Sequence, residues 1–97
     1  MVKHIVTFQL AGTAGERKLL AEQFRQALQA LPGQIPVLKD IEVGVNQNPN
    51  ENDDLVLIAT LPSMDDVPAY ANHPAHLAAT AVIKGKVTHR ACVDYQI

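Results

Sequence analysis

The chain has 97 residues, of which 47% are hydrophobic and 19% are charged, and its formal net charge is −2. This length and composition predict one soluble globular domain, residues 1–97, with a core of its own. The small negative charge without a Lys/Arg run argues against nucleic acids and anionic membranes as partners, and no apolar run approaches the roughly 20 residues of a membrane-spanning helix.

The first residues and the cysteine content bear on where the protein works. Residues 2–6 lack the longer apolar run and the small-residue cleavage site of a signal peptide. Cys92 is the only cysteine, so it cannot form an internal disulfide. We therefore expect a cytoplasmic protein, and we expect no redox or structural-zinc role for Cys92 alone.

A strand is predicted from Val2 to Leu10 because apolar side chains recur at alternate positions. The face that they share also carries His4. Two interpretations of His4 stay open: a core histidine with a backbone or side-chain partner, or a residue of a functional site.

An amphipathic helix follows this strand. Thr13 and Glu16 form a T-x-x-E capping box, in which each side chain accepts a hydrogen bond from the other residue's backbone N–H. Apolar residues then recur at i, i+4, i+7, i+8 and i+11, which places them in one stripe: Leu20, Phe24, Ala27, Leu28 and Leu31. Pro32-Gly33 ends the helix.

Two more strands are predicted, from about Val37 to Asn46 and from Leu55 to Leu61. The first alternates, with Ile41, Val43 and Val45 on one face, and a polar loop over residues 46–52 follows it. The second is apolar on both faces and therefore needs cover on both sides. In a chain this short, that cover points to a partner subunit.

A second helical region begins after these strands. Ser63 and Asp66 match a capping box of the S-x-x-D type, which predicts a helix that carries Val67 and Tyr70. Pro68 falls within the first turns of this helix, where a proline does least damage. The helix is expected to end between Tyr70 and Asn72.

The segment from Ala69 to His76 is the one on which the functional analysis rests. Pro74 suits the first turn of a helix and pushes the residue before it out of the α region. We therefore expect a corner at His73 and a second helix from Pro74 to about residues 84–86. Such a corner would aim Tyr70 and His76 at the same space.

The last predicted strand runs from Val87 to Ile97 and again alternates. The element order is then β-α-β-β-α-β, an α+β arrangement of the ferredoxin-like type. It has a four-stranded antiparallel sheet with helices on one face. The other face needs cover, and we expect a homodimer in which the sheets pack against each other.

Several segments resemble the stress-responsive A/B barrel, or Dabb, domain. They are Val2–Phe8, Gly44–Asn46, Asp54–Leu57, the motif Tyr70-x-x-His73-Pro74-x-His76, and Arg90–Tyr95. The resemblance covers nearly the whole chain in the right order. It implies a subunit of a dimeric α+β barrel.

The resemblance implies a small dimeric domain with a candidate small-molecule pocket. Most bacterial members have no assigned reaction, and the family name comes from stress-associated plant members, so stress-related ligand binding is the main expectation. A few plant members are polyketide cyclases, in which the tyrosine of this motif and the histidine two residues after the proline serve an aldol cyclisation. These correspond to Tyr70 and His76, with His4 in the same cavity.

The enzyme hypothesis is a cofactor-free cyclase or lyase. His76 would take a proton from a carbon next to a carbonyl group, and Tyr70 would donate a hydrogen bond to the carbonyl oxygen. Cofactor-independent oxygenation is a related variant. The expected substrate-binding residues are His4, Phe8, Phe24, Leu28, His73 and Leu77.

The alternative is a protein that only binds an apolar or aromatic ligand without reaction, or one whose dimer acts through its stability and association. His73 would then cap the helix that starts at Pro74, and Tyr70 would pack with its hydroxyl satisfied. A metal site at His73 and His76 is a third option, but no Cys/His/Asp/Glu cluster of metal spacing surrounds them in the sequence. No metal and no other cofactor is expected.

Overall fold

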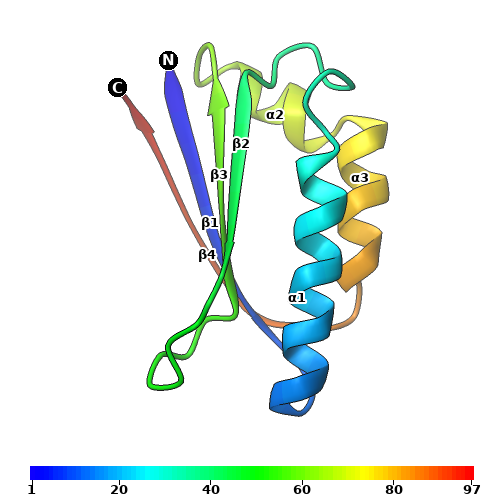
Figure 1. The fold of residues 1–97 in the computed structure, drawn as a ribbon. Coiled ribbons are helices and arrows are strands. Elements are labelled where there is room, and N and C mark those ends of the chain that lie inside the picture. The colour runs from blue at the N-terminus through cyan, green and yellow to red at the C-terminus, as the bar shows by residue number, and fades with distance from the viewer.

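The strands form one antiparallel sheet, and the helices cover one of its faces (Figure 1). The structure is a computed structural model that describes residues 1–97. The elements are β1 (Val2–Leu10), α1 (Ala14–Gln29), β2 (Asp40–Val45), β3 (Leu55–Leu61), α2 (Asp66–Ala71), α3 (Pro74–Thr80), a 3-10 turn (Ala81–Ile83) and β4 (Val87–Gln96). The strand order β2-β3-β1-β4 confirms the predicted ferredoxin-like fold. None of the helices has the length and hydropathy that crossing a membrane requires.

Helix α1 supplies much of the core, as its sequence pattern predicts. The capping box is present: Glu16 N–H donates to Thr13 Oγ1 at 3.2 Å, and Thr13 N–H donates to Glu16 Oε1 at 3.0 Å. The buried side of the helix is formed by Ala21, Phe24 and Leu28, and Leu31 just beyond its end is also buried. These side chains pack on the sheet and fix the helix across it.

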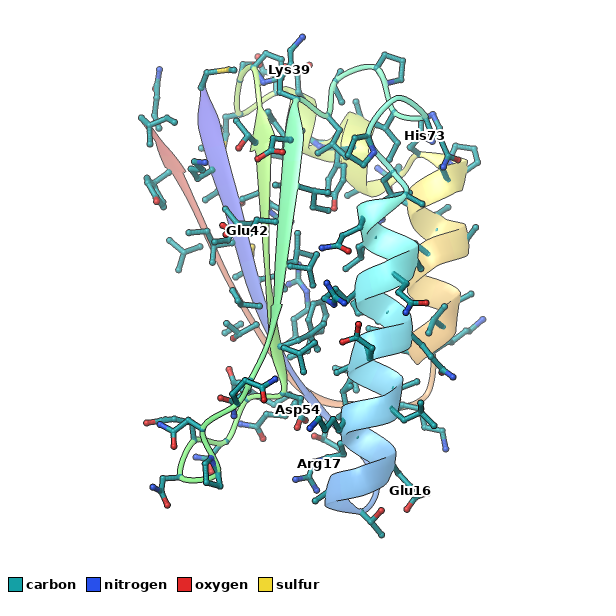
Figure 2. All side chains as sticks on the ribbon, viewed as in Figure 1. Glu16, Arg17, Lys39, Glu42, Asp54 and His73 are labelled. Atoms are coloured by element: carbon teal, nitrogen blue, oxygen red, sulfur yellow. The ribbon has the colours of Figure 1, made fainter.

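The loop before β3 is tied to the start of α1. Arg17 Nε lies 3.2 Å from Asp54 Oδ1, and Figure 2 shows the two side chains facing each other between helix and sheet. The other oxygen of Asp54 accepts a hydrogen bond from the backbone N–H of Leu10 at 2.7 Å. One carboxylate therefore joins α1, β1 and the start of β3.

Strand β1 lies inside the sheet, between β3 and β4. Its alternate residues Val2, His4, Val6, Phe8 and Leu10 are buried beneath the helices. The opposite face has no cover within the chain. Across it, Ile58, Ile5 and Val93 lie in register on neighbouring strands and form an apolar row. The strand that was expected to be apolar on both faces, β3, contributes to the core and to this row.

Three predicted boundaries are corrected by the structure. The helix from Pro74 was expected to reach residues 84–86, but α3 ends at Thr80 and a 3-10 turn follows it. The second strand was expected from Val37, but β2 begins at Asp40 because a turn with Leu38 N–H bonded to Ile35 C=O buries both residues first. The second capping box is only half formed. Asp66 accepts from the backbone N–H of Ser63, but the Ser63 hydroxyl donates to Asp66 instead of accepting from the helix, and α2 starts at Asp66.

Strand β4 lies at the sheet edge, and every residue in it is exposed. Asp94 pairs with His4 and Cys92 pairs with Val6. Directly paired residues of neighbouring strands project to the same face. Arg90, Cys92 and Asp94 therefore face the helices, and the alternate residues, among them Ala91 and Val93, face away from them.

Candidate active-site cavity

A cavity of about 810 Å³ lies between β1, β4 and the helices after β3. Its lining has 18 residues, of which 11 are hydrophobic with Cys92 counted among them; Val6, Phe8 and Phe24 are examples. The polar side chains belong to His4, His76, Thr80, Lys84, Arg90 and Asp94, and Cys92 adds a thiol. A second hollow beside the 46–52 loop, of about 570 Å³, has a mostly polar lining and no histidine. The first cavity is therefore the candidate site, because it holds the residues suited to acid-base or metal chemistry: His4, His76 and Cys92.

His76 reaches the cavity from α3 in a defined tautomer. Its Nδ1 lies 2.9 Å from the backbone oxygen of Ala71, so Nδ1 carries the hydrogen and donates it. This leaves Nε2 of the neutral ring with a free lone pair. Burial lowers the pKa of His76, and the nearby His4 and Arg90 lower it further, while the bond to Ala71 opposes them. The ring is therefore held as a neutral base.

Tyr70 lies between the two histidines. Its ring centroid is 5.8 Å from that of His4 in an edge-on contact and 4.6 Å from that of His76 in a tilted one. The side chain is fully buried, and its hydroxyl has no hydrogen-bond partner. Burial raises the pKa of Tyr70, so the phenol stays protonated and can act only as a neutral donor or acceptor. Tyr70 lies behind the cavity wall and is not part of the lining.

His4 has the partner expected of a core histidine and also lies on the cavity lining. It is buried and its Nδ1 is hydrogen-bonded to Asp94 Oδ1, which is the expected side-chain partner of a core histidine. It also lines the cavity. Cys92 Sγ lies 3.6 Å from the same Nδ1. Burial and the neighbouring Asp94 raise the pKa of Cys92, so its thiol is protonated at neutral pH.

The other residues expected at the site fall into two groups. Phe8, Phe24 and Leu77 line the cavity, whereas Leu28 lies in the core away from it. His73 is also outside the lining: its Nδ1 accepts the Ala75 N–H at 3.0 Å, which makes it the N-cap of α3. Figure 2 shows His73 at the end of this helix. The corner at His73 forms as predicted, and it aims His76 but not His73 into the cavity.

Sequence reasoning missed the contribution of β4. Arg90, Cys92 and Asp94 all line the cavity, and none was named as a site residue. The available signal was their spacing of two residues, which places them on one face of a strand. Ligand atoms of His4, Cys92 and Asp94 lie within 4.8 Å of one another, which makes them the residues able to hold a metal ion. His73 and His76 are not part of this group, and Nδ1 of each is hydrogen-bonded to the backbone.

Comparisons with known proteins agree with this fold. The family model of the stress responsive A/B barrel domain (Dabb) matches residues 2–97. A dimeric protein of unknown function with a ferredoxin-like fold from Bacteroides fragilis is 41% identical, with a TM-score of 0.93, and the match covers 99% of this chain and 95% of that chain. No curated protein matches the chain.

Two more distant structures extend the comparison. A dimeric ferredoxin-like protein of unknown function from Thermobifida fusca is 30% identical, with a TM-score of 0.78 and coverage of 99% of this chain and 90% of that chain. Hydroxynitrile lyase from Passiflora edulis is 17% identical, with a TM-score of 0.76 and coverage of 99% and 92%. The likeness to the lyase is one of fold alone.

Proposed function

The chain belongs to the stress responsive A/B barrel domain family, and from that premise we propose that it works as a homodimer that binds an apolar or aromatic small molecule in the cavity beside Tyr70 and His76. The observation that carries the proposal is the cavity itself, an apolar hollow with a small set of polar groups at one wall. Its volume of about 810 Å³ falls in the usual range for small-molecule sites, roughly 300–1,000 Å³.

The buried hydroxyl of Tyr70 supports the same proposal. A hydroxyl buried without a partner costs about 1–3 kcal/mol relative to a bonded one. Tyr70 packs against both histidines of the cavity from behind its wall, so the proposal requires this wall to part far enough for a carbonyl or hydroxyl oxygen of the ligand to reach the Tyr70 hydroxyl. This favours a ligand with an oxygen function on an otherwise apolar frame.

The charges of the lining narrow the ligand class further. Lys84 and Arg90 line the cavity, and neither takes part in an ion pair. The one carboxylate of the lining, Asp94, is bonded to His4. The cavity therefore has cationic groups without anionic partners, and these favour a ligand that carries a carboxylate or another anionic group.

A ligand-induced shift in melting temperature tests the proposal. The panel consists of aromatic and polyketide-like carbonyl compounds, each with and without a carboxylate. At a ligand concentration 100 times Kd, binding adds about 2.7 kcal/mol to the free energy of unfolding. In a domain of this size, that raises Tm by on the order of 10 °C. We expect the largest shifts from the carboxylated compounds and smaller ones in His76→Ala; no shift with any compound would contradict the proposal.

A second candidate function is cofactor-free catalysis at a carbonyl compound, and the free Nε2 of His76 favours it. A neutral imidazole in this tautomer can take a proton from a carbon next to a carbonyl group. If the same parting of the wall exposes the Tyr70 hydroxyl, it would donate a hydrogen bond to the developing oxyanion. Ring closure or bond cleavage would follow from the resulting carbanion, as in a cyclase or a lyase.

The family supports two further parts of the proposal. Similar chains of known structure are dimers, which favours a homodimer here. The family's name supports a stress-related role for the bound ligand, and the single cysteine supports a cytoplasmic location.

A further inference from the structure

Three side chains of different chemistry meet where β1 and β4 run side by side. They are the imidazole of His4, the thiol of Cys92 and the carboxylate of Asp94, and their ligand atoms lie within 4.8 Å of one another. His4 is separated by 88 and 90 positions from the other two in the sequence, but the strand register brings them to one face. Imidazole, thiolate and carboxylate are the three side-chain ligands that zinc uses in proteins.

The distances suit a zinc ion with a small adjustment. In a tetrahedral site, a Zn–S bond of about 2.3 Å and Zn–N or Zn–O bonds of about 2.0–2.1 Å place the sulfur roughly 3.6 Å from the other ligand atoms. Cys92 Sγ lies 3.6 Å from His4 Nδ1 and 3.8 Å from Asp94 Oδ1. Only His4 and Asp94, now hydrogen-bonded to each other, have to move apart, and the hydrogen on His4 Nδ1 is transferred to Nε2 as the ion takes its place.

The surroundings leave one coordination position open. All three residues line the cavity, so a fourth ligand would come from the cavity side. Three protein ligands with an open position are typical of catalytic zinc sites, whereas structural sites are closed by four. A histidine that binds metal through Nδ1 keeps its hydrogen on Nε2. The ring of Tyr70 packs edge-on against that of His4 and helps to hold its orientation.

We propose that His4 Nδ1, Cys92 Sγ and Asp94 Oδ1 bind a zinc ion whose fourth position is open to the ligand of the cavity. Binding releases the thiol proton of Cys92 to solvent, so the ion is held by a thiolate, a carboxylate and a neutral imidazole. The bound ion adds positive charge to a wall that already carries Arg90, and it would coordinate the oxygen of an anionic or carbonyl ligand. The metal site stands on its own geometry and does not depend on the proposed ligand.

Titration calorimetry with Zn²⁺ on tag-free protein, treated with chelator beforehand, is the first test. We expect one ion per chain in the wild type. Cys92→Ser should bind about 10- to 100-fold more weakly or lose binding altogether. Cys92 is exposed at the sheet edge, so this variant should keep its fold, which an unchanged melting curve without metal would verify.

His89→Gln is the matched control, because it removes an exposed histidine from the other face of the same strand. It should bind zinc as the wild type does. A wild type that binds no zinc, a Cys92→Ser variant that binds as well as the wild type, or a loss of binding in His89→Gln would each overturn the proposal.

Substitution with Co²⁺ supplies a readout that identifies the ligands. A cobalt ion bound to a thiolate shows a sulfur-to-metal charge-transfer band in the near ultraviolet, and visible bands report a tetrahedral site. We expect both in the wild type and the loss of the charge-transfer band in Cys92→Ser. Cobalt bound to the wild type without that band would show that Cys92 is not a ligand and would overturn the proposed site.

Discussion

Tyr70 and His76 illustrate how much of the site depends on single side chains. Pro74 breaks the helical region, and the resulting corner places the two rings 4.6 Å apart. In one continuous helix, residues six positions apart would lie on different faces. The sequence was sufficient to predict this pairing, because Pro74 acts through local backbone sterics.

The proposed catalysis by His76 leads to a prediction about pH. In that proposal the neutral ring is the base, and burial lowers its pKa, so it stays neutral to a lower pH than a free imidazole with its pKa of about 6.5. We expect the protein to exchange the α-hydrogens of a bound carbonyl compound for deuterium, with a rate that holds as the pH falls through 6.5 and drops only below it. NMR of the compound in D₂O measures this rate.

The exchange has a matched pair of variants. His76→Ala should lose it, whereas His73→Ala should keep it, because His73 lies outside the cavity lining. Exchange that persists in His76→Ala would assign the base to another residue, and exchange that is lost already above pH 6.5 would contradict the expected pKa.

Sequence analysis did not place three residues of β4 at the cavity: Arg90, Cys92 and Asp94. Strand β4 alternates apolar and polar residues, and a sheet with one free face offers no rule for which set faces the helices. The register with β1 decides it, since Asp94 pairs with buried His4. Strand pairing between the two ends of the chain is a long-range property, so these residues could not be found from local patterns.

At the scale of elements, the join between α2 and α3 depends on His73. Its Nδ1 accepts the Ala75 N–H, which satisfies a free donor in the first turn of α3. We predict that His73→Ala lowers the free energy of unfolding by about 1 kcal/mol through loss of this cap. Urea denaturation measures the change. Ligand affinity should stay within about twofold, because His73 does not line the cavity; unchanged stability together with lost binding would refute the capping role.

The start of β2 shows why another element was misplaced. The strand was expected to begin at Val37, directly after Ile35-Pro36. In the structure Ile35 and Leu38 are buried through a turn, not through a strand. Burial alone does not distinguish a packed turn from a strand end, whereas the capping box of α1 specifies backbone bonds and was predicted correctly.

At the scale of the whole molecule, the uncovered face of the sheet is the main feature that the single chain does not explain. Ile58, Ile5 and Val93 form an apolar row across three strands, and 61% of Val93 is exposed. Burial of such a row against a second copy would remove it from water. The strand pattern of β3 pointed to this partner because its alternate residues are apolar on both sides.

We predict a dimer at micromolar concentration and a monomer for Val93→Lys, because a lysine in this row would bury a charge at the interface. Light scattering coupled to size-exclusion chromatography gives the mass. Leu19→Lys is the control: Leu19 is 62% exposed on α1, so this variant should stay dimeric. A monomeric wild type, or a Val93→Lys variant that stays dimeric, would contradict assembly through this face.

The most direct test of the proposed ligand site compares two tryptophan variants. Each is titrated with the compound that gives the largest melting-temperature shift in the wild type. Leu77 lines the cavity and is 54% exposed, so Leu77→Trp should fill the cavity without disturbing the core. Leu19→Trp makes the same change on an exposed helix face away from the cavity. Titration calorimetry should show wild-type affinity in Leu19→Trp and a loss of at least about tenfold in Leu77→Trp. Equal affinities in the two variants would place the ligand elsewhere and contradict the proposed function.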